Sequence, residues 1–407
     1  MAADGVGSRA SGRSAGLDRL VPRMRPFEAS VFAQMSALAT RVGAINLGQG
    51  FPDADGPEEL KAIAVRAILD GTGNQYPPGH GLPDLRLAIA EHQQRIYRLA
   101  VDPSTDVVVT TGASEALAAA LLALVEAGDE VIVLEPFFDL YAAAIALTGA
   151  VQVTVPLTAP DPGSGAPFRL DADALAAAIT DRTRLILLNS PHNPTGMVLD
   201  RAELQQIAHL ATAHDLIVLS DEAYEHLYYA PSIHIPISTL PGMFERTVTV
   251  GSGGKSFSFT GWKVGWASGP THLIAPVRVV RQHLSYVSGG PFQPAIAAGL
   301  RLPDSYFEQF RADLMRKRDH LSAGLADLGF GVIGSQGTYF VITDVRPLGF
   351  ASGTEFCQEL PTRAGVVAIP VAALAARHDL FDPYVRWTFC KRTEVLDAAL
   401  DRLAAAP

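Results

Sequence analysis

Cysteine is scarce in this sequence: only Cys357 and Cys390 occur in 407 residues, and neither lies in a metal-ligand spacing. Two cysteines in so long a chain do not form a disulfide framework and are typical of a protein of the reducing cytoplasm. The eleven histidines are scattered, without an HExxH motif or a similar cluster. The sequence therefore predicts no metal site and a cytoplasmic location.

Positive charge and long apolar runs are also lacking. The 32 Lys and Arg residues are outnumbered by 42 Asp and Glu, which gives a net charge of −10. A nucleic-acid-binding protein needs a basic face, and a membrane span needs roughly 18 apolar residues in succession. We therefore expect neither nucleic acid nor a membrane as a partner.

The first 21 residues are rich in Gly, Ser and Ala and lack the apolar centre of a secretory signal. Their Arg and Ser content resembles that of a transit peptide, but Asp4 and Asp18 argue against one. This composition favours a disordered tail over residues 1–21.

From about residue 58 the sequence alternates short β-branched runs with Ala- and Leu-rich stretches. The alternation predicts an α/β fold, in which helical crossovers join the strands of a mostly parallel sheet and cover both of its faces. The predicted strands are 107–111, 130–134, 185–188, 216–220 and 247–250, and the predicted helices include 114–126 and 201–214. The DPGSGAP segment at 161–167 is predicted to be a loop of this unit.

The sequence pattern changes after about residue 304. A long charged helix over 304–328 is followed by the strand-like runs 331–333, 339–343 and 385–389. This part of the chain is predicted to be a second, smaller α+β unit.

Unusual polar residues follow the ends of the predicted strands, which is where ligands bind in open α/β sheets. The first segment, Thr110 to Glu115, closes a strand and opens a helix whose N-terminus favours an anion. It also fits an ordinary N-cap at Ser114.

The second segment, NSPHNPTG at 189–196, places Asn193 just beyond an apolar strand. Its His192 is expected to be a solvent-facing turn histidine, not a catalytic base.

The third segment, SDEAY at 220–224, ends a buried strand on a carboxylate. A buried Asp221 is costly unless a cation or several donors meet it. The alternative is a helix N-cap, with Tyr224 as a packing aromatic. The fourth segment, GSGGKS at 251–256, sets Lys255 behind glycines at a strand end, as a phosphate clamp or a reactive amine. A P-loop would need glycine where Thr249 stands, which argues against that motif.

Together these groups have the chemistry that pyridoxal phosphate requires. Asp221 can pair with the ring nitrogen, Asn193 and Tyr224 can hold the phenolate oxygen, and Lys255 can form an imine. The phosphate can be held by a helix N-terminus together with Ser252 and Lys263.

At these motifs the chain resembles the fold-type I, class I/II aminotransferases, which depend on pyridoxal phosphate and share an aspartate-aminotransferase-like fold. The resemblance covers roughly residues 22–404. It rests on NLGQGFPD at 46–53, NQYPPGHG at 74–81, EPFFDLY at 135–141, NSPHNPTG, SDEAYEHL at 220–227, GSGGKSFSFTGWKVGW at 251–266 and VRWTFCK at 385–391. The resemblance implies an N-terminal segment at 22–57 that joins the small domain, a large cofactor-binding domain at 58–304 and a small domain at 305–407.

The resemblance also implies a role for each matching residue. Lys255 would be the Schiff-base lysine, Asp221 the partner of the pyridinium, Phe138 the aromatic stacked on the ring, and Arg386 the clamp of the substrate α-carboxylate. Asn193 and Tyr224 would hold the phenolate oxygen, and the phosphate cup would consist of Gly112, Ala113, Ser114, Ser252 and Lys263. Gly50 would face the substrate. Tyr76 would reach the phosphate of a partner subunit, which implies a homodimer with composite sites.

Arg386 is also indicated by the sequence pattern itself. In the run 385–389, alternation places Val385, Trp387 and Phe389 on one face and Arg386 with Thr388 on the other. Guanidinium is the natural bidentate partner of a carboxylate. The alternative is a surface arginine on an edge strand.

Within the family, the chain is most similar to the N-succinyldiaminopimelate aminotransferases, through GQGFPDADGP, the SYVSGGPFQPA segment at 285–295 and VRWTFCKR. This similarity implies transfer of an amino group between glutamate and N-succinyl-2-amino-6-oxopimelate, in lysine and diaminopimelate biosynthesis. The kynurenine/glutamine-type aminotransferases, some of which are cysteine-conjugate β-lyases, share many of the motifs and are the alternative.

Overall fold

The computed structural model describes residues 19–28 and 30–406. The predicted tail at 1–21 lies outside the described residues except for its last three positions, so that prediction stays a prediction. Within the described residues, no helix is long and apolar enough to cross a membrane.

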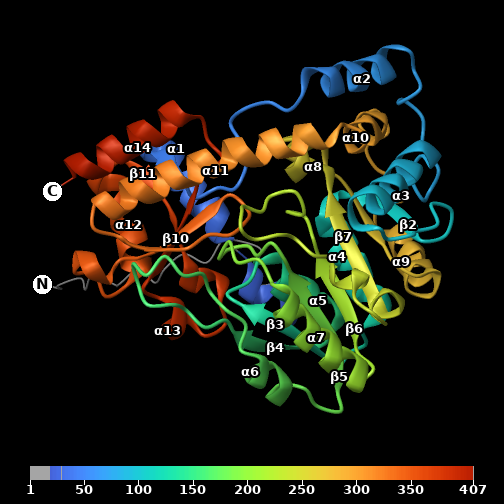
Figure 1. The fold of residues 1–407 in the computed structure, drawn as a ribbon, viewed down its shortest axis with the longest axis horizontal. Coiled ribbons are helices and arrows are strands. Elements are labelled where there is room, and N and C mark those ends of the chain that lie inside the picture. The colour runs from blue at the N-terminus through green and yellow to red at the C-terminus, as the bar shows by residue number, and fades with distance from the viewer. Residues whose placement is uncertain (1–18, 29, 407) are drawn as a thin grey trace, which may run out of the picture.

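A seven-stranded sheet forms the larger part of the molecule (Figure 1). Its strand order is β2-β8-β7-β6-β5-β3-β4, and only β8 runs antiparallel to its neighbours. The strands are β2 (Val107–Thr111), β8 (Val264–Ser268), β7 (Thr247–Ser252), β6 (Ile217–Asp221), β5 (Thr183–Asn189), β3 (Glu130–Glu135) and β4 (Val151–Pro156). The predicted α/β class with a mostly parallel sheet is confirmed.

Both faces of this sheet are buried, as the apolar strand β5 illustrates. Leu185 and Leu187 pack with α4 (Gly112–Leu124), α5 (Leu140–Thr148) and α9 (Thr271–Leu284) on one face. Ile186 and Leu188 pack with α6 (Ala172–Ala177) and α7 (Arg201–Ala213) on the other. Burial on both faces explains why the strand is a continuous apolar run without polar alternation.

The edge of the large sheet near β2 is covered by a further group of helices, which share one apolar cluster. These are α2 (Glu58–Leu69), α3 (Pro83–Tyr97) and α10 (Gln293–Leu300). Next in the chain comes α11 (Asp304–Asp327), which crosses the top of the view in Figure 1 from the large sheet to the C-terminal part.

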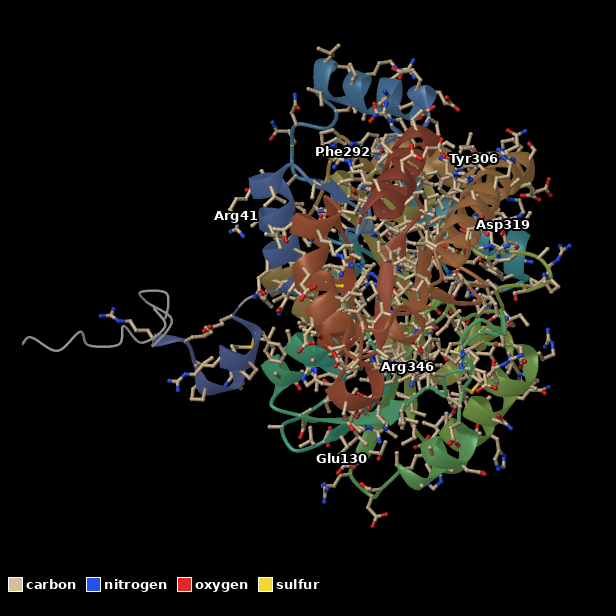
Figure 2. All side chains as sticks on the ribbon, turned by 90° about the vertical axis from the view of Figure 1, so that its left-hand side faces the viewer. Arg41, Glu130, Phe292, Tyr306, Asp319 and Arg346 are labelled. Carbon is tan, nitrogen blue, oxygen red and sulfur yellow. The ribbon has the colours of Figure 1, made fainter. Side chains whose placement is uncertain are left out.

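A four-stranded antiparallel sheet organises the C-terminal part, in the order β12-β13-β10-β9. Its strands are β12 (Ile369–Pro370), β13 (Tyr384–Thr388), β10 (Phe340–Asp344) and β9 (Gly331–Ile333). The helices α12 (Gly353–Arg363), α13 (His378–Phe381) and α14 (Thr393–Ala405) belong to the same part. Side chains fill the space between these elements and the large sheet (Figure 2).

The N-terminal segment is tied to this C-terminal part. After α1 (Val31–Val42), strand β1 (Ile45–Asn46) pairs in parallel with β11 (Val366–Val367). The chain then continues along residues 47–57 towards α2. This pairing places the segment beside the C-terminal sheet, and it positions one wall of the pocket described below.

Most predicted elements lie within two residues of the observed ones, but β4 and β8 were not predicted. β4 is a partly exposed edge strand whose sequence VQVTVP alternates apolar and polar residues, so its pattern was present and was overlooked. β8, VGWAS, contains Gly265 and Ser268 and gives neither an alternating nor a continuous apolar pattern. The proposed division into domains is not tested by these observations and stays a prediction.

Candidate active site

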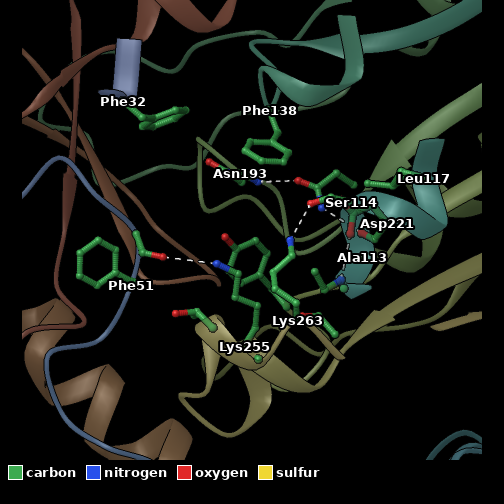
Figure 3. Close-up of a pocket in the computed structure, with 18 of the residues that line it drawn as sticks. Phe32, Phe51, Ala113, Ser114, Leu117, Phe138, Asn193, Asp221, Lys255 and Lys263 are labelled. Atoms are coloured by element: carbon green, nitrogen blue, oxygen red, sulfur yellow. Dashed lines mark hydrogen bonds between the residues drawn. The ribbon is translucent and has the colours of Figure 1, made fainter. Parts of the chain in front are cut away.

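A cavity of about 320 Å³ lies at the carboxyl ends of the parallel strands, between the large sheet and the C-terminal sheet. Figure 3 shows Phe32 and Phe51 at one end, Ser114 and Asp221 at the other, and Lys255 below Phe138. Every predicted site residue except Tyr76 lines this cavity: Gly50, Gly112, Ala113, Ser114, Phe138, Asn193, Asp221, Tyr224, Ser252, Lys255, Lys263 and Arg386.

An anion-binding arrangement is present where β2 turns into α4. Gly112 opens the helix with φ of 73°, in the left-handed region that favours glycine. Lys263 Nζ lies 3.4 Å from Ser114 Oγ. Gly265 must be glycine, because a Cβ there would lie 2.5 Å from the backbone nitrogen of Ala113. The helix N-terminus, a hydroxyl and an ammonium together suit a phosphate group.

Asp221 lies at the end of β6 and is fully desolvated. Its Oδ2 accepts a hydrogen bond from the Tyr141 hydroxyl at 2.7 Å, and its Oδ1 accepts one from the Ala223 N–H at 3.1 Å. Burial raises the pKa of the Asp221 carboxyl, whereas these two donors and the nearby Lys255 lower it. A positively charged ring nitrogen in the cavity would supply the counter-charge that this carboxylate lacks.

Lys255 lies on the short helix α8 (Gly253–Ser256), directly after β7. Its Nζ donates to the Tyr339 hydroxyl at 2.9 Å and to the Gly50 carbonyl at 3.3 Å. Burial lowers the pKa of its amine to about 8, and the positive charge of Arg386 acts in the same direction. The amine is therefore much easier to deprotonate than an ordinary lysine.

Arg386 is 1% exposed and projects from β13, which is a central strand. Its Nη1 donates to Asn193 Oδ1 at 2.9 Å and its Nη2 to the Gly48 carbonyl at 2.6 Å, while its Nε has no partner among the described residues. Burial lowers the pKa of the guanidinium to about 10, so it stays charged at neutral pH. The alternative of a surface arginine on an edge strand is wrong, because β10 and β12 flank the strand.

Two predicted residues behave differently from the others. His192 was expected to face solvent, but it is 3% exposed and its Nδ1 lies 2.8 Å from Thr195 Oγ1. Burial lowers its pKa to about 3, and the whole stretch from 191 to 199 around it is buried. Tyr76 is 80% exposed and stacks edge-to-face on Tyr286. Its contact with a partner's phosphate stays a prediction.

Sequence reasoning assigned no role to several residues that the structure places in or beside the cavity. Asn189 ends β5, so the strand-end pattern could have indicated it, whereas Tyr141 of the quoted EPFFDLY motif lies in α5, beyond the end of β3. Tyr339, Phe340 and Phe32 come from the C-terminal sheet and α1. No strand end of the large sheet signals these three residues.

The model of the family described as aminotransferase class I and II matches residues 42–403. The chain belongs to this family. It is a pyridoxal-phosphate-dependent aminotransferase with an aspartate-aminotransferase-like fold. The cavity fits the cofactor, since it combines a phosphate-binding helix N-terminus, a desolvated carboxylate that lacks a counter-charge, and a buried lysine whose pKa is lowered.

Three known proteins are similar to this aminotransferase over most of its length, with different degrees of sequence identity. The Mycobacterium tuberculosis protein named "Probable N-succinyldiaminopimelate aminotransferase DapC" is 51% identical over 94% of this chain and 98% of its own length. The solved structure of N-succinyldiaminopimelate aminotransferase from the same species superimposes with a TM-score of 0.92, at 52% identity, over 94% of this chain and 99% of that one. Kynurenine–oxoglutarate transaminase 3 of Mus musculus is 37% identical over 93% and 88% of the two chains.

Proposed function

We propose that this aminotransferase moves an amino group between glutamate and N-succinyl-2-amino-6-oxopimelate, a step of lysine and diaminopimelate biosynthesis. The observation that carries the proposal is the identity of 51% to the Mycobacterium tuberculosis relative over nearly the whole chain, against 37% to the kynurenine transaminase. The match extends over 94% of this chain, so it spans the segments that form the walls of the pocket.

In this proposal, Gly112, Ala113, Ser114, Ser252 and Lys263 hold the phosphate of the cofactor. Asp221 pairs with the ring nitrogen, Phe138 stacks on the ring, and Asn193 with Tyr224 holds the phenolate oxygen. Tyr141 is added to the predicted set, because its hydroxyl is bonded to Asp221 and fixes the carboxylate. The bound cofactor supplies an electron-poor ring that can accept the electron pair of the substrate Cα–H bond.

Lys255 would serve both as the anchor of the cofactor and as the group that moves the proton. Its Nζ takes the proton from the substrate Cα and returns it during the exchange. A general base works best when its pKa lies near the working pH. A pKa of about 8 leaves an appreciable fraction of the amine unprotonated near neutrality.

Arg386 would bind the α-carboxylate that donor and acceptor have in common. Its guanidinium already donates to Asn193 and to the Gly48 carbonyl, so the fork is held in place before a substrate arrives. A fixed guanidinium gives a carboxylate two parallel hydrogen bonds. The same clamp can therefore serve both half-reactions.

We extend the proposal to a cytoplasmic homodimer. Among the described residues, only three cations line the cavity: Lys255, Lys263 and Arg386. All three have roles at the cofactor or at the α-carboxylate, and a succinylated substrate brings further carboxylates. A partner subunit that contributes residues near Tyr76 would complete the site. The two cysteines are free and buried, in keeping with a reducing compartment.

The decisive experiment is a screen of donors and acceptors with the purified protein. N-succinyl-diaminopimelate, kynurenine, glutamine and a cysteine conjugate are each paired with 2-oxoglutarate, and initial rates are compared. We expect the highest kcat/KM for the succinylated substrate. An equal or higher value for kynurenine, or release of pyruvate and ammonia from the conjugate, would assign the alternative function. Light scattering of the same sample measures whether it is a dimer.

A further inference from the structure

The hydroxyl of Tyr339 lies between the proposed catalytic lysine and the N-terminal strip, which we define as residues 47–53. Lys255 Nζ donates to this hydroxyl at 2.9 Å, and the hydroxyl donates onward to the Gly50 carbonyl at 2.6 Å. The amine also lies 3.3 Å from the same carbonyl. Amine, phenol and carbonyl thus form three mutual hydrogen bonds, and the side chain of Tyr224 also hydrogen-bonds with that of Tyr339.

The ring of Tyr339 is fixed independently of this hydroxyl. It packs edge-to-face on Tyr224, with centroids 5.3 Å apart, and on Phe340 at 5.0 Å. The side chain is 1% exposed. Its backbone carbonyl accepts from the Phe389 N–H at 2.9 Å, which ties the residue to the end of β13. The hydroxyl is therefore held in one place by a rigid ring, whatever happens to the lysine.

The strip fits closely over this arrangement. A Cβ on Gly50 would lie 2.5 Å from Phe340 Cζ and 3.0 Å from Tyr339 Cε2, so only glycine brings its carbonyl so near. Two neighbouring strip carbonyls are also bonded to cations: Gly48 accepts from Arg386 at 2.6 Å, and Phe51 accepts from Lys391 at 2.8 Å. The strip is thus held at three successive points, and Tyr339 controls the middle one.

We infer that Tyr339 is a positioning residue for the free amine of Lys255 and joins that amine to the strip. The inference deepens the proposed function, because it rests on Lys255 as the group that moves the proton. The geometry described is that of the free amine; a covalent bond to the cofactor would engage this nitrogen and change its donation to Tyr339. Whenever the amine is free, Tyr339 and the Gly50 carbonyl would hold it in the pocket beneath the strip.

The bonding pattern has a direct electrostatic consequence. Because Tyr339 donates its own proton to Gly50, a lone pair of its oxygen faces Lys255 and stabilises the protonated amine. The other groups that act on this amine are Cys390 and Asp221, which raise its pKa, and Arg386 and Lys263, which lower it. Tyr224 lies 5.6 Å from the Nζ by its ring centroid.

The test uses Tyr339→Phe, which keeps the ring and removes only the hydroxyl. In the full-length protein freed of cofactor, the pH dependence of Lys255 labelling by an amine reagent, read by peptide mass spectrometry, gives the pKa of the amine. Loss of one hydrogen bond to a charged group should lower this pKa by about one to two units. In the holoenzyme, kcat should fall about 10- to 100-fold with little change in KM. The kinetic isotope effect of an α-deuterated amino donor should rise.

Tyr229→Phe is the matched control. Its hydroxyl is also buried and donates to the carbonyl of Thr338, beside Tyr339, but it makes no contact with Lys255. Loosening of this loop alone would therefore affect both variants, whereas we expect the control to keep the pKa of Lys255 and the isotope effect unchanged. A higher KM without a change of kcat or pKa in Tyr339→Phe would overturn the inference. The labelling experiment involves no amino acceptor, so its result is independent of the proposed substrate.

Discussion

One short segment, residues 220–226, serves two buried regions of the molecule with contrasting properties. Asp221 and Tyr224 line the cofactor cavity. Glu222 and Glu225 point away from it, into a cluster of buried polar side chains. We call this second region the histidine cluster; it consists of His92, Tyr97, Glu222, Glu225, His226 and His234.

Within the histidine cluster, Glu225 has partners, but both ring nitrogens of His92, Nε2 of His226 and Nδ1 of His234 have no hydrogen-bond partner among the described residues. Tyr97 donates to Glu225 at 2.9 Å, His92 Nε2 lies 3.5 Å from the same carboxylate, and His226 stacks on Phe307 at 4.1 Å. Burial raises the pKa of Glu225, but the surrounding histidines and Tyr97 outweigh it and lower the pKa to about 2. Burial also lowers the pKa of His226 to about 3.

The difference between the two regions lies in the cavity. Asp221 and Arg386 line it, and Arg386 Nε has no partner among the described residues. No residue of the histidine cluster lines this cavity, although the cluster also holds buried ring nitrogens without a partner. Strongly shifted pKa values occur in both regions, so they do not identify an active site without a cavity beside them. The predictions below test this contrast.

The largest effect is expected for Lys255→Ala. The variant should lose the visible absorption of the covalently bound cofactor, and transamination should fall by at least about 10⁴-fold, because the anchor and the proton carrier are both removed. Thermal unfolding should change little. If borohydride still reduces the cofactor onto the protein, another lysine is the anchor.

Arg386→Lys is expected to have the next largest effect. Lysine keeps the charge but loses the planar fork, and with it at least one charge-assisted hydrogen bond worth about 1.5–3 kcal/mol. kcat/KM should therefore fall roughly 10- to 150-fold for donor and acceptor alike. Cofactor absorption should stay the same. A loss confined to one of two dissimilar donors would show that Arg386 binds the side chain of that donor and not the α-carboxylate.

Glu225→Gln tests the contribution of the histidine cluster. The charged hydrogen bond from Tyr97 becomes a neutral one and the 3.5 Å contact with His92 loses its charge, which should lower the free energy of unfolding by about 1–3 kcal/mol. Urea unfolding measures this loss. At a temperature where the variant is folded, kcat should stay within about twofold of the wild type, since Glu225 does not line the cavity. A large loss of kcat in the folded variant would contradict the contrast between the two regions.

The smallest effect is expected for the pH dependence of stability. His226 has a folded pKa of about 3, below its unfolded value, so the unfolded chain binds a proton that the folded chain does not. Stability should therefore fall as the pH drops below about 6.5, by about 1–2 kcal/mol for this residue at pH 5. His226→Gln should flatten the curve by that amount in urea unfolding at pH 5, 6 and 7. An unchanged slope would mean that His226 is protonated in the folded protein.

The groups predicted from the sequence are those that follow strands of the large sheet. Asp221, Asn193 and Lys255 could be predicted because each comes directly after an apolar run, and parallel strands end at one edge. Arg386 was predicted from alternation, but the central position of its strand depends on pairing with residues more than 40 positions away, as with Val341 and Trp387.

Other parts of the site could not be predicted by these means. Tyr141 reaches Asp221 across 80 residues of sequence from the start of α5, and Tyr339 reaches Gly50 across 289. The first contact depends on how α5 packs on the large sheet and the second on how the two sheets pack, which no local pattern encodes. The burial of His192 was missed for the same reason, because turn chemistry alone does not reveal which turns are buried.

The pairing of β1 with β11 also determines when the pocket can form during synthesis. Ile45 pairs with Val366, and the Gly48 carbonyl meets Arg386 across 338 residues, so the strip cannot dock until nearly the whole chain has been made. The large sheet draws only on residues 107–268 and can assemble earlier, in keeping with the folding of large proteins unit by unit from the N-terminus. A chain still on the ribosome would thus carry Lys255 in an unfinished site, and the wall formed by residues 45–51 would be the last to close.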